Sequence, residues 1–167
     1  MANKQGTTTA AGGTPPRIAT PILPSPPSET EAKLYYFGLP SRPILVARSS
    51  TTPWEEYTGP EEDRPRKGLG PVGYHPIGFI WENGLADKLI AILDSLDVKF
   101  TSLDLVRIRS GDDYAAPAPV VLWIGVMPGS LSGEHGVVVV SKCLGLLGEH
   151  DITDVEVEIR ESVVVRY

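Results

Sequence analysis

The stretch that decides the fold is Val120-Val121-Leu122-Trp123-Ile124-Gly125-Val126, which presents no polar side chain on either face. A strand of this kind is covered on both faces or lies in the middle of a sheet. With Met127, the run is still far shorter than the roughly 18–20 residues that cross a bilayer. The sequence therefore predicts a buried central strand here, and we expect no membrane partner.

Two helices are predicted, one before this strand and one after it. Apolar residues recur at three- and four-residue steps over residues 77–96, behind Pro76, which suits a first helical turn. After the strand, Ser132 suits an N-cap position, and Glu134 lies in the first turn, where the helix dipole favours negative charge. An apolar stripe over residues 137–147 then continues the second helix.

Three further strands complete the pattern. Residues 44–47 form a short apolar run, and residues 98–108 alternate with a break that indicates a bulge near Ser102. Over residues 155–160, apolar and charged side chains alternate, as in a strand with one wet face.

The resulting order is strand, helix, strand, strand, helix, strand. It matches the split-βαβ, ferredoxin-like arrangement. We predict an α/β (α+β) domain with a βαββαβ sheet and two helices on one face. In that arrangement the first and third strands are central, and the second and fourth, which carry charge here, are edges.

The chain divides into an arm and one domain. Residues 1–32 are rich in Pro, Thr and Ser and contain little that could anchor a core, which predicts a disordered arm. Residues 33–167 are expected to form a single domain, interrupted by a long irregular connection over residues 49–73.

The amino-acid composition indicates which partners and which cellular compartment to expect. The net charge is −6 with a pI near 5.0, and the densest basic run, at residues 64–67, lies beside the acidic residues 61–63. A nucleic-acid partner is therefore not expected. Cys143 is the single cysteine, and the N-terminus lacks the pattern of a signal peptide. These features predict a cytosolic or nuclear protein.

Two segments carry candidate interaction residues. Trp54, in the long connection, is either an aromatic docking point or, as we favour, an anchor for that connection. The carboxylates of residues 151–161 are consistent with metal binding or acid–base chemistry, but their alternation favours a solvated edge. Glu161 breaks this parity, which indicates a bulge or a specific partner for its side chain. The candidate interaction residues are Trp54, Glu156, Glu158 and Arg160.

No catalytic, cofactor-binding or metal-binding residue is predicted. The three histidines, His75, His135 and His150, lack the close spacing of a zinc site. The loop at residues 129–133 lacks the lysine of a phosphate-binding loop. We interpret Cys143 as a buried, inert thiol.

Several stretches resemble an uncharacterised family of fungal proteins. They are residues 35–40, 52–55, 100–108, 121–133 and 151–162, so the likeness covers nearly everything after residue 34. Longer members of that family carry a C-terminal region that resembles a trypsin-like peptidase fold. The resemblance implies that this chain corresponds to the region before it, and no peptidase residue is carried over.

These observations favour a non-catalytic protein-interaction or regulatory module, with a protein partner or self-association through its sheet. Two alternatives stay open at this point. One is a metal-dependent enzyme that uses the acidic strand 151–161. The other is a truncated N-terminal domain of a longer protein with a peptidase-like region.

Overall fold

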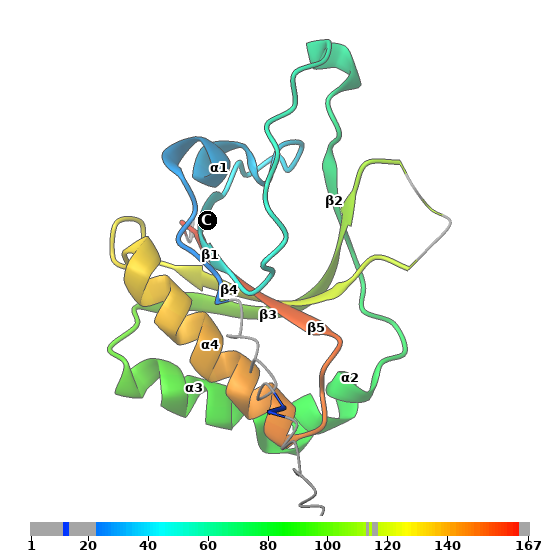
Figure 1. Cartoon of the computed structure of the whole chain (residues 1–167). Helices are drawn as coiled ribbons and strands as arrows, with labels where there is room; N and C mark the ends of the chain where they lie inside the picture. Colours follow the sequence, from blue (N-terminus) through cyan, green and yellow to red (C-terminus); the bar gives the residue numbers. More distant parts are fainter. Residues whose placement is uncertain (1–11, 14–22, 113, 115–116, 164–167) are drawn as a thin grey trace, which may run out of the picture.

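The computed structural model describes residues 12–13, 23–112, 114 and 117–163. It is a mixed α+β structure built on a five-stranded curled sheet with the order β1-β5-β4-β3-β2 (Figure 1). The strands are β1 (Ile44–Arg48), β2 (Lys67–Gly70), β3 (Phe100–Ser110), β4 (Val120–Val126) and β5 (Val155–Glu161). Neighbouring strands are antiparallel, except that β4 and β5 run parallel.

The helices lie on both sides of this sheet. They are α1 (Glu29–Leu34), α2 (Pro76–Ile80), α3 (Ala86–Ser95) and α4 (Gly133–Glu149), with a 3-10 turn η1 (Glu61–Asp63) and a π-helical turn η2 (Trp81–Leu85). Figure 1 shows α3 and α4 side by side along one face of the sheet, with α1 on the opposite side. We call the face covered by α3 and α4 the helix face, and the face on the side of α1 the polar face.

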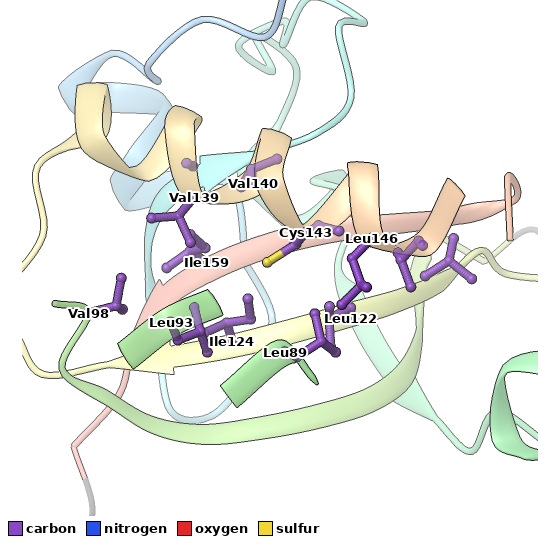
Figure 2. Close-up of a cluster of buried hydrophobic side chains, with 14 of the residues drawn as sticks. Leu89, Leu93, Val98, Leu122, Ile124, Val139, Val140, Cys143, Leu146 and Ile159 are labelled. Carbon is purple, nitrogen blue, oxygen red and sulfur yellow. The ribbon is translucent and has the colours of Figure 1, made fainter. Parts of the chain in front are cut away.

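An aliphatic core fills the space between the helix face and the two helices (Figure 2). Its members include Leu89, Leu93, Leu122, Ile124, Val139, Val140, Cys143, Val157 and Ile159. Alternate residues of β4 and β5 point into it, because successive side chains of a strand lie on opposite faces. Each fully buried leucine or isoleucine contributes about 1.5–3 kcal/mol, so this core is a main source of stability.

The predicted second helix and its N-cap are confirmed in α4, although the buried stripe is formed by Val139, Val140, Cys143, Leu146 and Leu147, and Ser141 is exposed. Ser132 caps the helix, because its hydroxyl accepts a hydrogen bond from the His135 backbone N–H at 3.2 Å. Gly136 brings the helix close to β1, since a Cβ atom there would lie 2.9 Å from the Cβ of Ala47. The buried strand at residues 120–126 and the irregularity near Ser102 are also confirmed.

The strand order differs from the ferredoxin-like prediction. β1, predicted to be central, is an edge strand, whereas β5 and β3, both predicted to be edges, are inner: β5 lies between β1 and β4, and β3 lies between β4 and β2. The charges of β5 had indicated an exposed edge. In the structure, Glu158 and Arg160 are both buried on the polar face, where they have partners from other elements. A strand with charged side chains can therefore lie inside a sheet when other elements supply hydrogen-bond partners for them.

The first long helix is interrupted, which the apolar spacing did not predict. Asn83 and Gly84 have non-helical backbone angles within the π-helical turn, and Gly84 has φ of 113°. Glycine adopts such positive values without the penalty that a Cβ atom imposes. The apolar repeat resumes at Leu85 and so conceals the break.

Two predicted irregular regions contain ordered elements. The connection 49–73 includes β2, which pairs with β3 from Lys67 opposite Ser110 to Gly70 opposite Arg107. Ordered structure also starts before the predicted arm boundary at residue 32, because α1 begins at Glu29 behind an N-cap at Ser28. The rest of the arm lies mostly outside the described residues.

A membrane crossing would need a long, uniformly apolar helix. Within the described parts of the chain, no helix has that combination of length and composition.

Candidate functional site

The most unusual feature of the polar face is a buried carboxylate held by two phenols. Tyr35 and Tyr36, directly after α1, each donate a hydrogen bond to Glu158 on β5. The distances are 2.7 Å from the Tyr35 hydroxyl to Oε1 and 2.8 Å from the Tyr36 hydroxyl to Oε2. Only 2% of Glu158 is exposed. Each of its oxygens therefore accepts a hydrogen bond from a protein donor.

The contacts continue across β4 to a buried arginine. The indole N–H of Trp123 donates to the Tyr36 hydroxyl at 3.0 Å, and the two rings meet edge to face. On the other side, the guanidinium carbon of Arg160 lies 3.3 Å from the centre of the Trp123 ring. We call Tyr35, Tyr36, Trp123, Glu158 and Arg160 the buried polar network.

The electrostatics of this network favour protonated phenols. Burial raises the pKa of Tyr36, and the neighbouring Glu158 carboxylate raises it further. The same two causes raise the pKa of Tyr35. Burial also raises the pKa of Glu158, while the bonds from the two tyrosines act in the opposite direction. The tyrosines thus serve as hydrogen-bond donors, and neither is suited to act as a base.

A cavity of about 410 Å³ opens beside this network, and we call it the Glu158 cavity. Its lining includes Tyr35, Arg48, Trp54, Lys67, Glu156 and Glu158. These residues come from β1, β2, β5, the segment after α1 and the long connection, so the fold brings distant parts of the chain together here.

The charges in the Glu158 cavity are unequally paired. Arg48 is engaged, because its Nε lies 2.8 Å from Glu31 and its two terminal nitrogens donate to backbone carbonyls. Lys67 donates to the Ser110 hydroxyl at 2.7 Å and lies 4.4 Å above the Tyr35 ring. Burial lowers the pKa of Lys67. Glu156 has no ion pair or side-chain hydrogen bond with any other described residue.

A second cavity of about 550 Å³ lies on the other side of Trp123, and we call it the Arg160 cavity. Its lining includes Ser41, Arg42, Ile44, Leu69, Arg160 and Ser162. Trp123 contributes to its wall as well. The buried polar network therefore separates two hollows on the same face of the sheet.

The structure brings three of the four predicted interaction residues into one place. Trp54, Glu156 and Glu158 line the Glu158 cavity, whereas Arg160 lines the second one. Interpreting these charges as a solvated edge was wrong for Glu158 and Arg160, which are 2% and 9% exposed. Sequence reasoning missed the tyrosine pair and Lys67. One signal in the sequence pointed to this face: Glu158 and Arg160 are two residues apart on one strand, so their side chains lie on the same side of the sheet.

The carboxylates of residues 151–161 do not converge. Asp154 pairs with His75 at 2.9 Å, Glu158 binds the two tyrosines, and Glu161 accepts a hydrogen bond from the Gly129 backbone N–H at 2.9 Å. Of the two alternatives for Glu161, a bulge or a specific partner, the structure shows the partner. Among the residues that the structure describes, no three His, Cys, Asp or Glu side chains are grouped so that they could hold a metal ion.

Cys143 lies fully buried in the aliphatic core, as predicted. Burial raises the pKa of its thiol to about 12, so the reactive thiolate is disfavoured.

Comparison with known proteins adds no further constraint. No family model, curated protein or solved structure matches this chain. The resemblance to the fungal family therefore stays a prediction.

Proposed function

We propose that this protein is a non-catalytic interaction module that binds a partner polypeptide at the Glu158 cavity. The observation that carries the proposal is the cavity itself, which is lined by aromatic and charged side chains from several segments far apart in the sequence. Concave sites with a few convergent polar groups are the usual places for recognition.

The groups around this cavity support binding better than proton transfer. Each oxygen of Glu158 already accepts a hydrogen bond from a phenol, and the tyrosine pKa values are raised. A general base must lie within hydrogen-bond reach of its substrate, and Glu158 is only 2% exposed. Glu158 instead stabilises the cavity wall, and it holds the segment after α1 against the sheet.

Trp54 supports a polypeptide as the occupant. It lies half-buried on the rim, where it also borders two neighbouring hollows along the connection. Tryptophan is enriched among the residues that dominate protein–protein binding energy, because it offers a large apolar surface together with one donor. The nearby Glu156 carboxylate provides a site for a basic group on the partner.

The test is selection of binders from a display library of random seven-residue peptides, followed by affinity measurements on purified variants. We expect Trp54→Ala to weaken the selected peptides at least about tenfold, which corresponds to 1.4 kcal/mol. Phe79→Ala is the matched control, because it removes an exposed aromatic side chain from α2 outside the cavity.

The result that would overturn the proposal is equal binding to wild type and Trp54→Ala. A selection that yields no peptide tighter than about 100 μM would contradict it too. Sedimentation of the free protein shows whether a second copy of the chain is the occupant.

A further inference from the structure

Arg160 is a buried cation whose contacts are long. Its Nη2 lies 3.3 Å from an oxygen of Asp104 and 3.5 Å from the Ser102 hydroxyl. Both distances exceed the roughly 2.7–2.9 Å of a strong charge-assisted hydrogen bond. The Asp104 side chain is 45% exposed, so water competes for it. Nη1 is buried and has no hydrogen-bond partner among the described residues.

Such a group needs a physical explanation. A buried charge is stable only when it is paired and its hydrogen bonds are made. Unsatisfied buried groups are rare in native proteins, and they often mark the position of a water, ion or ligand. The carboxylate of the next residue, Glu161, is engaged by the Gly129 backbone N–H.

The orientation of Arg160 is fixed in advance. Its guanidinium lies against the Trp123 ring, and that ring is held by the hydrogen bond from its N–H to Tyr36. A planar group that is stacked on an aromatic face loses little further entropy when it binds a ligand.

The Arg160 cavity adds a second cation and an apolar wall. Arg42 lies on its lining with a left-handed backbone, φ of 45°, which costs energy for a residue other than glycine. Ile44 and Leu69 supply apolar surface, and Leu69 is 50% exposed although it lies on the sheet. The hollow of about 550 Å³ falls in the size range of small-molecule sites.

We propose that the Arg160 cavity binds a small organic carboxylate. The carboxylate accepts hydrogen bonds from Arg160 and Arg42, since a guanidinium matches the planar geometry of a carboxylate. The apolar body of the ligand covers Leu69. This site is separate from the Glu158 cavity, and it stands whether or not a polypeptide binds there.

The experiment is a titration of the whole chain with benzoate, monitored by NMR at the indole N–H of Trp123. The indole signals of Trp54 and Trp81 serve as internal references. We expect saturable binding with a dissociation constant of about 1 mM or below. Benzamide, which has the same shape without the charge, should bind at least about tenfold more weakly.

Three variants locate the site. Arg42→Ala removes an exposed guanidinium and should weaken benzoate about fivefold to tenfold. Arg160→Lys keeps the charge but loses the planar fork, and it should weaken binding at least about tenfold. Arg66→Ala removes an exposed guanidinium elsewhere and should leave benzoate binding unchanged.

Several outcomes would overturn the proposal. They are the absence of saturation below about 20 mM benzoate, equal affinity for benzamide, and an equal loss in Arg66→Ala and Arg42→Ala. A fourth is tight, Arg42-dependent binding of an acidic peptide without binding of benzoate, because the carboxylate would then belong to a polypeptide. Arg42→Ala keeps the test decisive if Arg160→Lys fails to fold.

Discussion

On the helix face of the sheet, β4 presents Leu122 and Ile124 to aliphatic side chains of α3 and α4, whereas on the polar face it presents Trp123 to a phenol and a guanidinium. Both faces are buried. The aliphatic core depends on volume and shape, and its members can adjust to one another. The buried polar network depends on each donor having its acceptor. The same strand is therefore stabilised in two ways that should respond differently to mutation.

The largest loss of stability is expected at Trp123, which is both a large buried ring and a member of the buried polar network. Trp123→Ala removes a buried ring together with its contacts to the Tyr36 hydroxyl and the Arg160 guanidinium, and it should cost about 3–5 kcal/mol. Leu122→Ala, one residue away on the helix face, should cost about 2–5 kcal/mol. Urea unfolding of both variants measures the difference. If Trp123→Ala is as stable as wild type, the ring is not packed as described.

A smaller loss is expected when one hydroxyl is removed from the buried polar network. Tyr36→Phe leaves Glu158 with one phenol donor and leaves the Trp123 N–H without an acceptor, so we expect a loss of about 1–3 kcal/mol. Tyr74→Phe is the control, because Tyr74 is fully exposed. Thermal and urea unfolding should show no change in that control. A loss in Tyr36→Phe no greater than that in Tyr74→Phe would contradict the network.

The pH dependence of stability separates Glu158 from an ordinary surface carboxylate. Burial raises its pKa above the reference value of 4.5, so the native state holds this proton more tightly than the unfolded chain does. Its contribution to stability is present below the unfolded pKa and is lost as the pH rises through the folded pKa. The free energy involved is about 1.4 kcal/mol for every pH unit that separates the folded pKa from the unfolded one.

Comparison with Glu158→Gln tests this dependence. The free energy of unfolding of wild type minus that of the variant should fall as the pH is raised from about 4 to 8. A difference that rises over this interval would show that the tyrosine hydrogen bonds outweigh burial.

The smallest effect, with the opposite sign, is expected at Asp154. Its hydrogen bond with His75 lowers its pKa below the reference value of 3.8, so its contribution is present above the unfolded pKa and is lost as the pH falls. Because the Asp154 side chain is largely exposed, the effect should stay below about 1 kcal/mol. Unfolding of Asp154→Asn between about pH 2 and 7 measures it. If the pH dependence of stability changes as much in Asp154→Asn as in Glu158→Gln, the contrast between an exposed and a buried carboxylate is contradicted.

The helix face was largely predictable from the sequence, because its signals are local. The apolar run of β4, the Ser132 cap and the stripe of α4 depend on neighbouring residues. β2 was missed because its sequence, Lys67-Gly68-Leu69-Gly70, has the glycines that local propensity disfavours in strands. Its pairing with β3 determines its conformation instead.

The polar face was only partly predictable. Glu156, Glu158 and Arg160 were identified as candidates from their alternation on one strand, but the burial of Glu158 and Arg160 depends on partners far away in the sequence. The Tyr35 hydroxyl bonds a carboxylate 123 positions along the chain, and no local pattern encodes that contact. The inner position of β5 follows from the same long-range pairing.

This inner position of β5 has a consequence for how the chain acquires its structure. During synthesis, β1 and the tyrosine segment emerge long before β5, which is the neighbour that each of them contacts. Loops of such length close slowly, because their entropy is lost before the contact forms. Tyr36 and Leu45 therefore remain without their final partners while the intervening residues are made. A nascent chain in this state exposes apolar surface and an unpaired strand edge, which are the features that chaperones bind.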